Sequence, residues 1–391
     1  VSFDGGDHWL SLQLNLPAAS VRDLDVHSSD LVAATFGRAL WVLDDVTPLR
    51  QTTGDMAAAK ARLYAPQTAT RVRWDVNQDT PLPAETPAGA NPPDGAIVYY
   101  YLKSPVSDVR LDIYDARGAL VRSFSSTPEK APKLPPNAPE YWFADEPALS
   151  TQAGLNRFVW DLRYQHPETL PYGYYGNLLG YVEYTLPDHA IPGETPRYQP
   201  LGALVAPGEY KLVLTAGDAS YSQNLTVKPD PRVQVTQPDL EAQLSLALSI
   251  AAQMKLSASI SAQLTGVQAE LAARKQALPA DNSASDAAKA IQSLANKARA
   301  LDAGRGSKLG FGLVNRDLAR LITMVESADM RPSESAVQAV ADLCVDLNKD
   351  LASWRESNAT DIPALNLLLQ KYKIDPVKPA AQIPADVSCP K

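Results

Sequence analysis

Tyrosines are concentrated in one segment of this sequence, residues 163–206, where glycines separate them. Its candidate binding residues are Tyr172, Tyr174, Tyr175, Tyr181 and Tyr184. Tyrosine rings offer flat apolar faces with a hydroxyl at the edge, which suits a sugar ring or a protein surface. The segment is longer than a connection in a compact domain needs, and such loops often carry function. The alternative is that the rings cover a neighbouring domain, because buried aromatic residues are commoner than binding ones.

Two cysteines, Cys344 and Cys389, permit one disulfide, which would tie the C-terminal tail to a helix. The alternative is a small buried side chain in a helix and a free thiol in the tail. The sequence leaves both interpretations open. Two cysteines and four histidines cannot build a site of the zinc-finger type. We therefore expect no metal and no cofactor.

The sequence predicts no catalytic residue. The adjacent carboxylates Asp44 and Asp45 lie at the end of a predicted strand, where neighbouring side chains point to opposite faces. Glycoside hydrolysis needs two carboxylates about 5 to 10 Å apart on either side of the bond that breaks, so this pair is poorly placed. The glycine-rich stretch 304–312 lacks the spacing of a phosphate-binding loop and follows a helix rather than a strand. It indicates an inter-helix loop.

Charge and composition narrow the classes of partner. The net charge is −8, from 44 acidic and 36 basic residues, which argues against nucleic acid and against an anionic membrane surface. Apolar residues make up 45% of the chain and charged residues 20%, a balance typical of globular proteins. No apolar run is expected to reach the roughly 20 residues of a membrane span.

The first residues form the pattern S-x-D-x-G-x-x-W, with Ser2, Asp4, Gly6 and Trp9 at its fixed positions. Asp4 can accept hydrogen bonds from the N–H groups of its own turn, and glycine permits a positive φ. Trp9 is expected to begin the next strand. Three further strands are predicted at 21–26, 31–36 and 39–43, the rhythm of one propeller blade.

This pattern resembles the Asp-box hairpin, also called the BNR repeat, of sialidase-like and sortilin-like β-propellers. Residues 33–45 resemble the last blade of large secreted bacterial Asp-box proteins that are often labelled glycosyl hydrolases. The resemblance covers about the first fifty residues. It implies a structural role for the motif, a secreted or periplasmic location, and upstream propeller blades of the same chain as partners. Because Val1 is not Met and lies inside the motif, we expect a longer protein.

The middle of the chain, residues 62–232, is predicted to form an Ig-like β-sandwich. Val109–Phe124 alternates apolar and polar residues on either side of a tight turn that contains Gly118. Its predicted partner strands are 156–162, with Phe158, Trp160 and Leu162 inward, and 208–227. Together these strands resemble the Ig-like sandwich of the flagellar hook-capping protein, which the segment 163–206 interrupts.

Residues 236–373 are predicted to form an antiparallel helical bundle. Thr236 caps the first helix, which can run to about Leu278, and Ser333 caps the fourth. The other helices are predicted at 285–303, 313–328 and 361–372. One core-facing stripe of the fourth helix comprises Val337, Val340, Cys344, Leu347, Leu351 and Trp354. Residues 374–391 form a proline-rich tail.

The predicted fold class is therefore multidomain β plus α: a partial β-propeller blade at 1–60, the sandwich, the bundle and the tail. The leading functional hypothesis is a non-catalytic accessory and interaction region that binds glycan or protein. One alternative is a glycoside hydrolase whose active site lies in upstream blades. The other is a sortilin-like scaffold that binds peptides.

Overall fold

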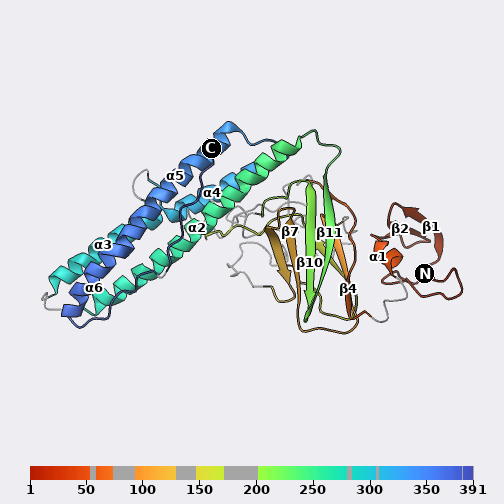
Figure 1. The fold of residues 1–391 in the computed structure, drawn as a ribbon, viewed down its shortest axis with the longest axis horizontal. Coiled ribbons are helices and arrows are strands. Elements are labelled where there is room, and N and C mark those ends of the chain that lie inside the picture. Colours follow the sequence, from red (N-terminus) through yellow and green to blue (C-terminus); the bar gives the residue numbers. More distant parts are fainter. Residues whose placement is uncertain are drawn as a thin grey trace.

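The computed structural model describes residues 1–52, 59–73, 93–128, 147–170, 201–279, 284–304, 308–380 and 382–390. Three parts follow one another along the molecule: a small N-terminal sheet, a β module of two sheets, and an elongated helical bundle (Figure 1). The chain is thus a multidomain β plus α protein.

The N-terminal sheet has three antiparallel strands in the order β1-β2-β3. They are β1 Val21–His27, β2 Asp30–Thr35 and β3 Leu40–Leu43, and a short helix α1, Thr47–Gln51, follows. The three predicted strands are confirmed within a residue or two. The expected strand at Trp9 is wrong: no strand is assigned there, and the side chain is 73% exposed. The ends of this loop are joined at Val1 and Leu10 by two main-chain hydrogen bonds of 2.7 and 2.8 Å.

The β module consists of a five-stranded sheet in the order β5-β11-β10-β7-β8 and a three-stranded sheet in the order β4-β6-β9. All pairs are antiparallel except β5 with β11, which is parallel. The strands are β4 Ala61–Leu63, β5 Ala69–Arg71, β6 Ala96–Leu102, β7 Val109–Asp115, β8 Leu120–Ser125, β9 Gly154–Trp160, β10 Gly208–Ala216 and β11 Ala219–Pro229.

One apolar core fills the space between these two sheets. Alternate residues of each strand point inward, as strand geometry requires; Leu111, Ile113 and Leu212 are fully buried examples. Trp160 is also fully buried, and its Nε1 donates to the Arg163 carbonyl at 3.0 Å. The inward positions predicted for strand β9 are confirmed, although the strand ends before Leu162, whose φ is +57°.

The helical bundle contains α2 Gln237–Gln276, α3 Ser285–Ala303, α4 Phe311–Val325, α5 Glu334–Glu356 and α6 Ile362–Lys371. Thr236 caps α2 by accepting the Asp239 N–H, and Ser333 caps α5 by accepting the Ala336 N–H, so both predicted caps are confirmed. The last helix, predicted at 361–372, spans Ile362–Lys371 and is not preceded by a loop. A π-helical turn, Ser357–Asp361, joins α5 to α6 directly.

Helix α2 is long and apolar enough to cross a membrane when judged by length and composition alone. No such run was expected from the sequence. Of its most apolar window, 56% is buried within the bundle. Central helices of bundles meet the same two criteria, so the result assigns no membrane contact.

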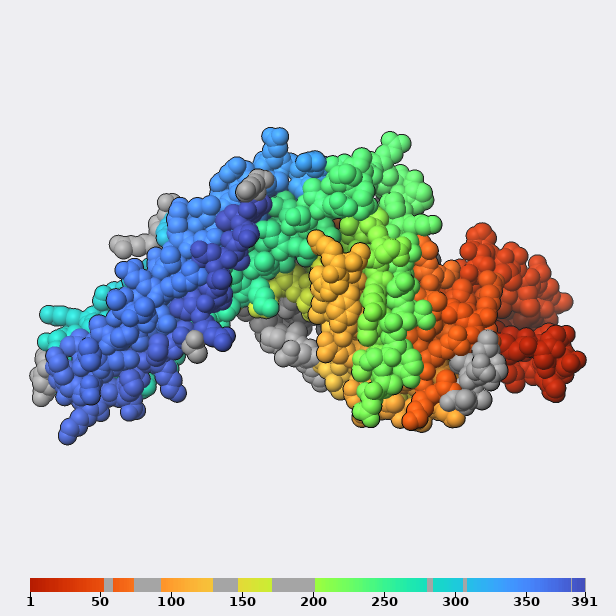
Figure 2. Space-filling model, in the orientation of Figure 1, coloured from red at the N-terminus to blue at the C-terminus, as the bar shows by residue number. Residues whose placement is uncertain are grey.

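Cys344 and Cys389 form a disulfide with a Cα–Cα distance of 5.5 Å. This decides between the two interpretations that the sequence left open. Cys344 lies in the core-facing stripe of α5, of which Val340, Leu347, Leu351 and Trp354 are also buried. The bond fixes the end of the tail, which returns along the bundle from α6 and ends beside α5 (Figures 1 and 2).

Candidate functional site

The candidate binding residues Tyr172, Tyr174, Tyr175, Tyr181 and Tyr184 lie outside the described residues. What the structure describes is the root of their segment, namely a first stem at 163–170 and a second at 201–206. The stems leave and re-enter the β module where it meets the bundle. The contacts that hold these two stems therefore define the described part of the site.

The two stems are paired with each other. Arg163 and Leu204 form an antiparallel bridge, and the N–H of Tyr164 donates to the Ala203 carbonyl at 2.9 Å. Gly202 is needed for this close approach, because a Cβ on it would lie 1.9 Å from the Tyr164 carbonyl oxygen. Any larger side chain would force the stems apart.

Glu326, the residue that follows α4, holds both stems from the bundle side. Its Oε2 accepts the main-chain N–H of Leu204 at 3.1 Å and lies 3.5 Å from Nη1 of Arg163. The same oxygen accepts from Nη2 of Arg73 at 3.1 Å. One buried carboxylate thus connects the two stems with the segment that follows β5.

Arg71, at the end of β5, lies beside this carboxylate and is almost wholly buried. Its Nε donates to the Val205 carbonyl at 2.8 Å, its Nη2 donates to Gln243 at 3.2 Å, and it forms an ion pair with Asp329. Burial lowers the pKa of the Arg71 guanidinium, and the nearby Asp329 carboxylate opposes that shift.

Gln243 of α2 completes the arrangement. Its Nε2 donates to the carbonyl of Val325, the last residue of α4, at 2.7 Å and to the carbonyl of Ala328 beyond the helix at 2.6 Å. We call this set of side chains the bundle joint: Arg71, Arg73, Arg163, Gln243, Glu326 and Asp329. It connects β5, both stems, α2 and the end of α4.

Asn315 of α4 hydrogen-bonds the main chain of the first stem and so attaches it to the bundle. Its Oδ1 accepts the Leu170 N–H at 2.9 Å, and its Nδ2 donates to the Glu168 carbonyl at 3.0 Å. Nδ2 also lies 3.0 Å from the Met254 carbonyl of α2. A fully buried amide thus fixes the last described residues of this stem to two helices.

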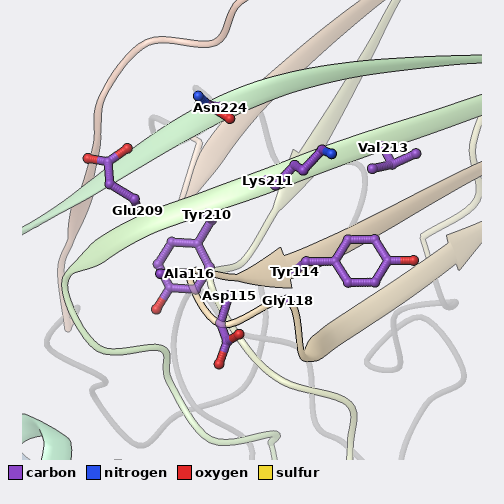
Figure 3. Close-up of a pocket in the computed structure, with 9 residues that line it drawn as sticks. All are labelled: Tyr114, Asp115, Ala116, Gly118, Glu209, Tyr210, Lys211, Val213 and Asn224. Atoms are coloured by element: carbon purple, nitrogen blue, oxygen red, sulfur yellow. The ribbon is translucent and has the colours of Figure 1, made fainter.

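An open hollow of about 660 Å³ lies at the turn between β7 and β8 (Figure 3). Figure 3 shows Tyr114, Lys211 and Val213 on the strands beside it. Its carboxylates already have partners. Asp115 accepts the N–H groups of Arg117 and Ala119; burial acts to raise the Asp115 pKa, but these hydrogen bonds leave it lowered.

The second carboxylate in the wall of this hollow, Glu209, accepts the Thr226 hydroxyl at 2.8 Å. The geometry pairs no nucleophile with a base there. The hollow is large enough for a small ligand, but the residues that line it form no arrangement that indicates catalysis.

The S-x-D-x-G-x-x-W pattern folds into a loop in which the Asp4 carboxylate is hydrogen-bonded by residues of the same loop. Asp4 Oδ1 accepts the His8 N–H at 3.0 Å and the Ser2 hydroxyl at 2.8 Å. The Ser2 hydroxyl accepts the Gly6 N–H at 2.9 Å, and Trp9 donates to the Gly6 carbonyl at 3.0 Å. Hydrogen bonds from the His8 main chain and side chain, and from Ser2, lower the Asp4 pKa to about 2.

Asp44 and Asp45 hold the N-terminal sheet to the β module. Asp44 pairs with Arg157 at 3.2 Å, and its carbonyl accepts the Tyr99 hydroxyl at 3.1 Å. Asp45 is buried and accepts from Gln67 at 2.6 Å. Gln51 adds two hydrogen bonds of 2.9 Å to the main chain of Ala65.

We call this second set of contacts the N-terminal joint: Asp44, Asp45, Gln51, Ala65, Gln67, Tyr99 and Arg157. Both carboxylates are thus engaged in contacts within the protein, in keeping with the structural interpretation of the pair.

Among the described residues, no group of three or more His, Cys, Asp or Glu side chains is placed to hold a metal ion. Comparisons of the chain with protein-family models, with curated proteins and with solved structures gave no match.

Sequence reasoning missed the residues that build the root, above all Arg71, Asn315 and Glu326. Their partners lie more than a hundred residues away, at separations of 134, 145 and 122 residues. No local spacing pattern signals contacts at that range.

Proposed function

We propose that this chain is a non-catalytic accessory and interaction region of a secreted Asp-box β-propeller protein. In this proposal residues 1–52 are a propeller blade, the β module is an Ig-like sandwich, and the bundle is fixed behind it. The observation that carries the proposal is the apolar surface of the N-terminal sheet.

One face of this sheet is apolar except at the end of β2, where Thr35 follows Leu31 and Ala33 in the alternation. The pairing register places three rows on it: Leu24 and Val26 of β1, Leu31 and Ala33 of β2, and Trp41 and Leu43 of β3. Leu24 and Val26 are more than half exposed. Leu40 and Val42 are also more than half exposed and alternate with Trp41 and Leu43, so they lie on the opposite face.

Exposed apolar patches of this kind mark interaction sites, because a sheet gains stability by burying its apolar face. Neighbouring blades of a propeller would cover both faces. The self-contained Asp-box loop agrees with a blade, since its carboxylate stabilises a turn. The disulfide agrees with an oxidising compartment such as the periplasm or the cell exterior.

The test is hydrogen exchange on the polypeptide as purified from its natural source, compared with residues 1–391 expressed alone. The amides of β1 are expected to be protected in the natural polypeptide and to exchange rapidly in residues 1–391. Equal, rapid exchange of β1 in both would overturn the blade assignment, because neighbouring sheets would then be absent.

For the interaction role, the tyrosine-rich segment stays the proposed binding element for glycan or protein. Support comes from its root: paired stems, Glu326 and Asn315 present the segment from a rigid base. A binding loop on a rigid base loses less conformational entropy when its ligand binds.

The double substitution Tyr174→Ala and Tyr175→Ala tests this role. Retention on a glycan array or on a column of candidate partner proteins should be lost, and the melting temperature should stay unchanged. The control is Tyr114→Ala, a half-buried tyrosine on the outer face of β7. A fall in melting temperature with no retention by either protein would show that the rings seal the structure instead.

A further inference from the structure

The C-terminal tail lies extended along the bundle, held by side chains that contact its main chain. We call the surface that holds it the tail groove: Gln263 and Glu270 of α2, Asn348 of α5, Asn358 of the π-helical turn and Asn366 of α6. From Asn348 to Asn366 the helices advance about 27 Å at 1.5 Å per residue. Ten steps of extended chain, the separation of Val387 from Val377 in sequence, correspond to a similar length of about 31 Å at 3.1 Å per residue.

Three asparagines contact the tail in the same way. Asn366 accepts the Val377 N–H at 2.8 Å and donates to the carbonyl of that residue at 2.9 Å. Asn358 does the same at Ala380, with distances of 2.8 and 3.3 Å.

Asn348 repeats this pattern at Val387, with distances of 3.2 and 2.9 Å. A helix cannot offer its own main-chain groups sideways, because they bond along the helix axis. Side-chain amides, with a donor and an acceptor each, can replace them.

Other groove side chains bind further main-chain groups of the tail. Glu270 accepts the Lys378 N–H at 2.9 Å, and Gln263 donates to the Gln382 carbonyl at 3.1 Å. Contacts of this kind do not depend on the side chains of the bound segment. The prolines of the tail, Pro376, Pro379, Pro384 and Pro390, have no N–H to satisfy and favour extended backbone.

The apolar contact between the tail and the bundle is concentrated at one residue of the tail. Val377 is fully buried, whereas Ile383 and Val387 pack against the bundle core more loosely. Asn358 lies in the π-helical turn, and such turns occur frequently at functional sites. The tail itself therefore shows what the groove recognises: an extended, proline-containing segment with one buried aliphatic side chain.

We propose that the tail groove is a binding site for an extended, proline-containing peptide, and that the tail is its intramolecular occupant, locked by the Cys344–Cys389 disulfide. A thiol reductant opens the lock. Its thiolate attacks the bond, Cys344 and Cys389 each end as a thiol, and the reductant leaves as its own disulfide. The tail can then exchange with a peptide of the same pattern.

The attached tail has a high effective concentration, so the test must weaken it without altering the groove. Cys389→Ser combined with Val377→Asp does this, because the new charge cannot remain in the apolar pocket. The probe is a fluorescein-labelled peptide with the natural sequence of residues 374–390 and Ser at position 389. Fluorescence anisotropy should show binding to this variant and none to the oxidised natural chain.

Adding Asn366→Ala should weaken peptide binding roughly tenfold, since two hydrogen bonds are lost. Asn296→Ala, on the exposed face of α3, is the matched control and should leave the affinity unchanged. A variant that keeps its helical circular dichroism yet binds no peptide would overturn the proposal.

If the double variant does not fold, Cys389→Ser alone decides by hydrogen exchange. The amides of Val377, Lys378, Ala380 and Val387 should exchange together, well before the core of α5. Exchange of these amides only through global unfolding would show that the tail is a permanent part of the bundle.

Discussion

The β module is attached at both ends by hydrogen bonds and ion pairs, but the two attachments differ in exposure. In the N-terminal joint the Arg157 and Asp44 side chains are 37% and 29% exposed. In the bundle joint the Arg71 and Asp329 side chains are 1% and 6% exposed. The same pairing of arginine with carboxylate therefore lies in two different dielectric environments.

Exposure determines how much each joint depends on its charges. Exposed pairs contribute about 0 to 1 kcal/mol, because water and salt screen them. A buried pair gains little over an apolar replacement, yet removing one partner leaves a buried charge without compensation. The Arg71–Asp329 pair of the bundle joint should therefore tolerate substitution poorly, and the Arg157–Asp44 pair of the N-terminal joint should tolerate it well.

The largest effect is expected for Arg71→Ala. It leaves the Val205 carbonyl and Gln243 without their donor, and Asp329 with Arg73 as its remaining ion-pair partner. Unfolding in urea should show a loss of about 3 to 5 kcal/mol, because two buried acceptors lose their donor at about 1 to 3 kcal/mol each and the buried ion-pair cluster loses one of its arginines. Lys349→Ala, whose ion pair with Asp346 is more than half exposed on both sides, is the control and should change stability little. A loss below about 1 kcal/mol for Arg71→Ala would contradict the contrast between the joints.

Alkaline pH should weaken the β module and its N-terminal joint before the bundle. Burial raises the pKa of Tyr100 from 10.0 to about 12, and burial also raises that of Tyr99 in the N-terminal joint. In the unfolded chain these tyrosine hydroxyls lose their protons at a lower pH than in the folded protein. The free energy of unfolding therefore falls as the pH rises from about 10 to about 12. Near-ultraviolet circular dichroism should decline over this range while the helical signal at 222 nm persists. Simultaneous loss of both signals would contradict the prediction that the β module unfolds before the bundle.

A smaller effect is expected for Arg157→Ala, which removes the exposed ion pair of the N-terminal joint. The loss should be at most about 1 kcal/mol and should shrink further in high salt. Thermal unfolding at low and at high sodium chloride measures both quantities. A large loss of stability that does not depend on salt would show that the Arg157–Asp44 pair is shielded from water as completely as the bundle joint.

The smallest effect is expected for Asp4→Asn, which acts within the N-terminal loop of residues 1–10 and touches neither joint. The low pKa of Asp4 means that its contribution is present above about pH 4 and is lost as the pH falls through about 2. An NMR titration of the Asp4 carboxyl should show the low value, and the binding proposed for the tyrosine-rich segment should not change. Loss of that binding in a folded Asp4→Asn protein would refute the structural role.

Local patterns in the sequence predict elements well. The predicted ends of helix α3 are confirmed, and the alternation around Trp160 correctly places this ring in the core. Caps at Thr236 and Ser333 are predictable because a cap needs a partner only three residues away. Strands β4 and β5 have three residues each, too few for a period to be visible.

Contacts between distant segments were not predictable. Arg71 lies in a three-residue strand, and nothing near it in sequence indicates an ion pair with Asp329. The asparagines of the tail groove are spaced by ten and eight residues, which matches no helical motif. The disulfide could not be decided for the same reason, since the pairing depends on the path of the tail.

The parallel pairing of β5 with β11 and the contacts of the neighbouring arginines have a consequence for biosynthesis. Their partners Val205, Gln243 and Asp329 follow at separations of 134, 172 and 256 residues. At about 5 to 20 residues per second, a ribosome needs roughly 10 to 50 s to reach the last of them. Until Ala219–Pro229 has been made, the nascent chain carries β5 without its partner strand, and until Glu326 and Asp329 have been made it carries Arg71 and Arg73 without counter-charges. Co-translational folding should therefore begin in the β6–β9 and β7–β8 pairs, and the connection to the bundle should form last.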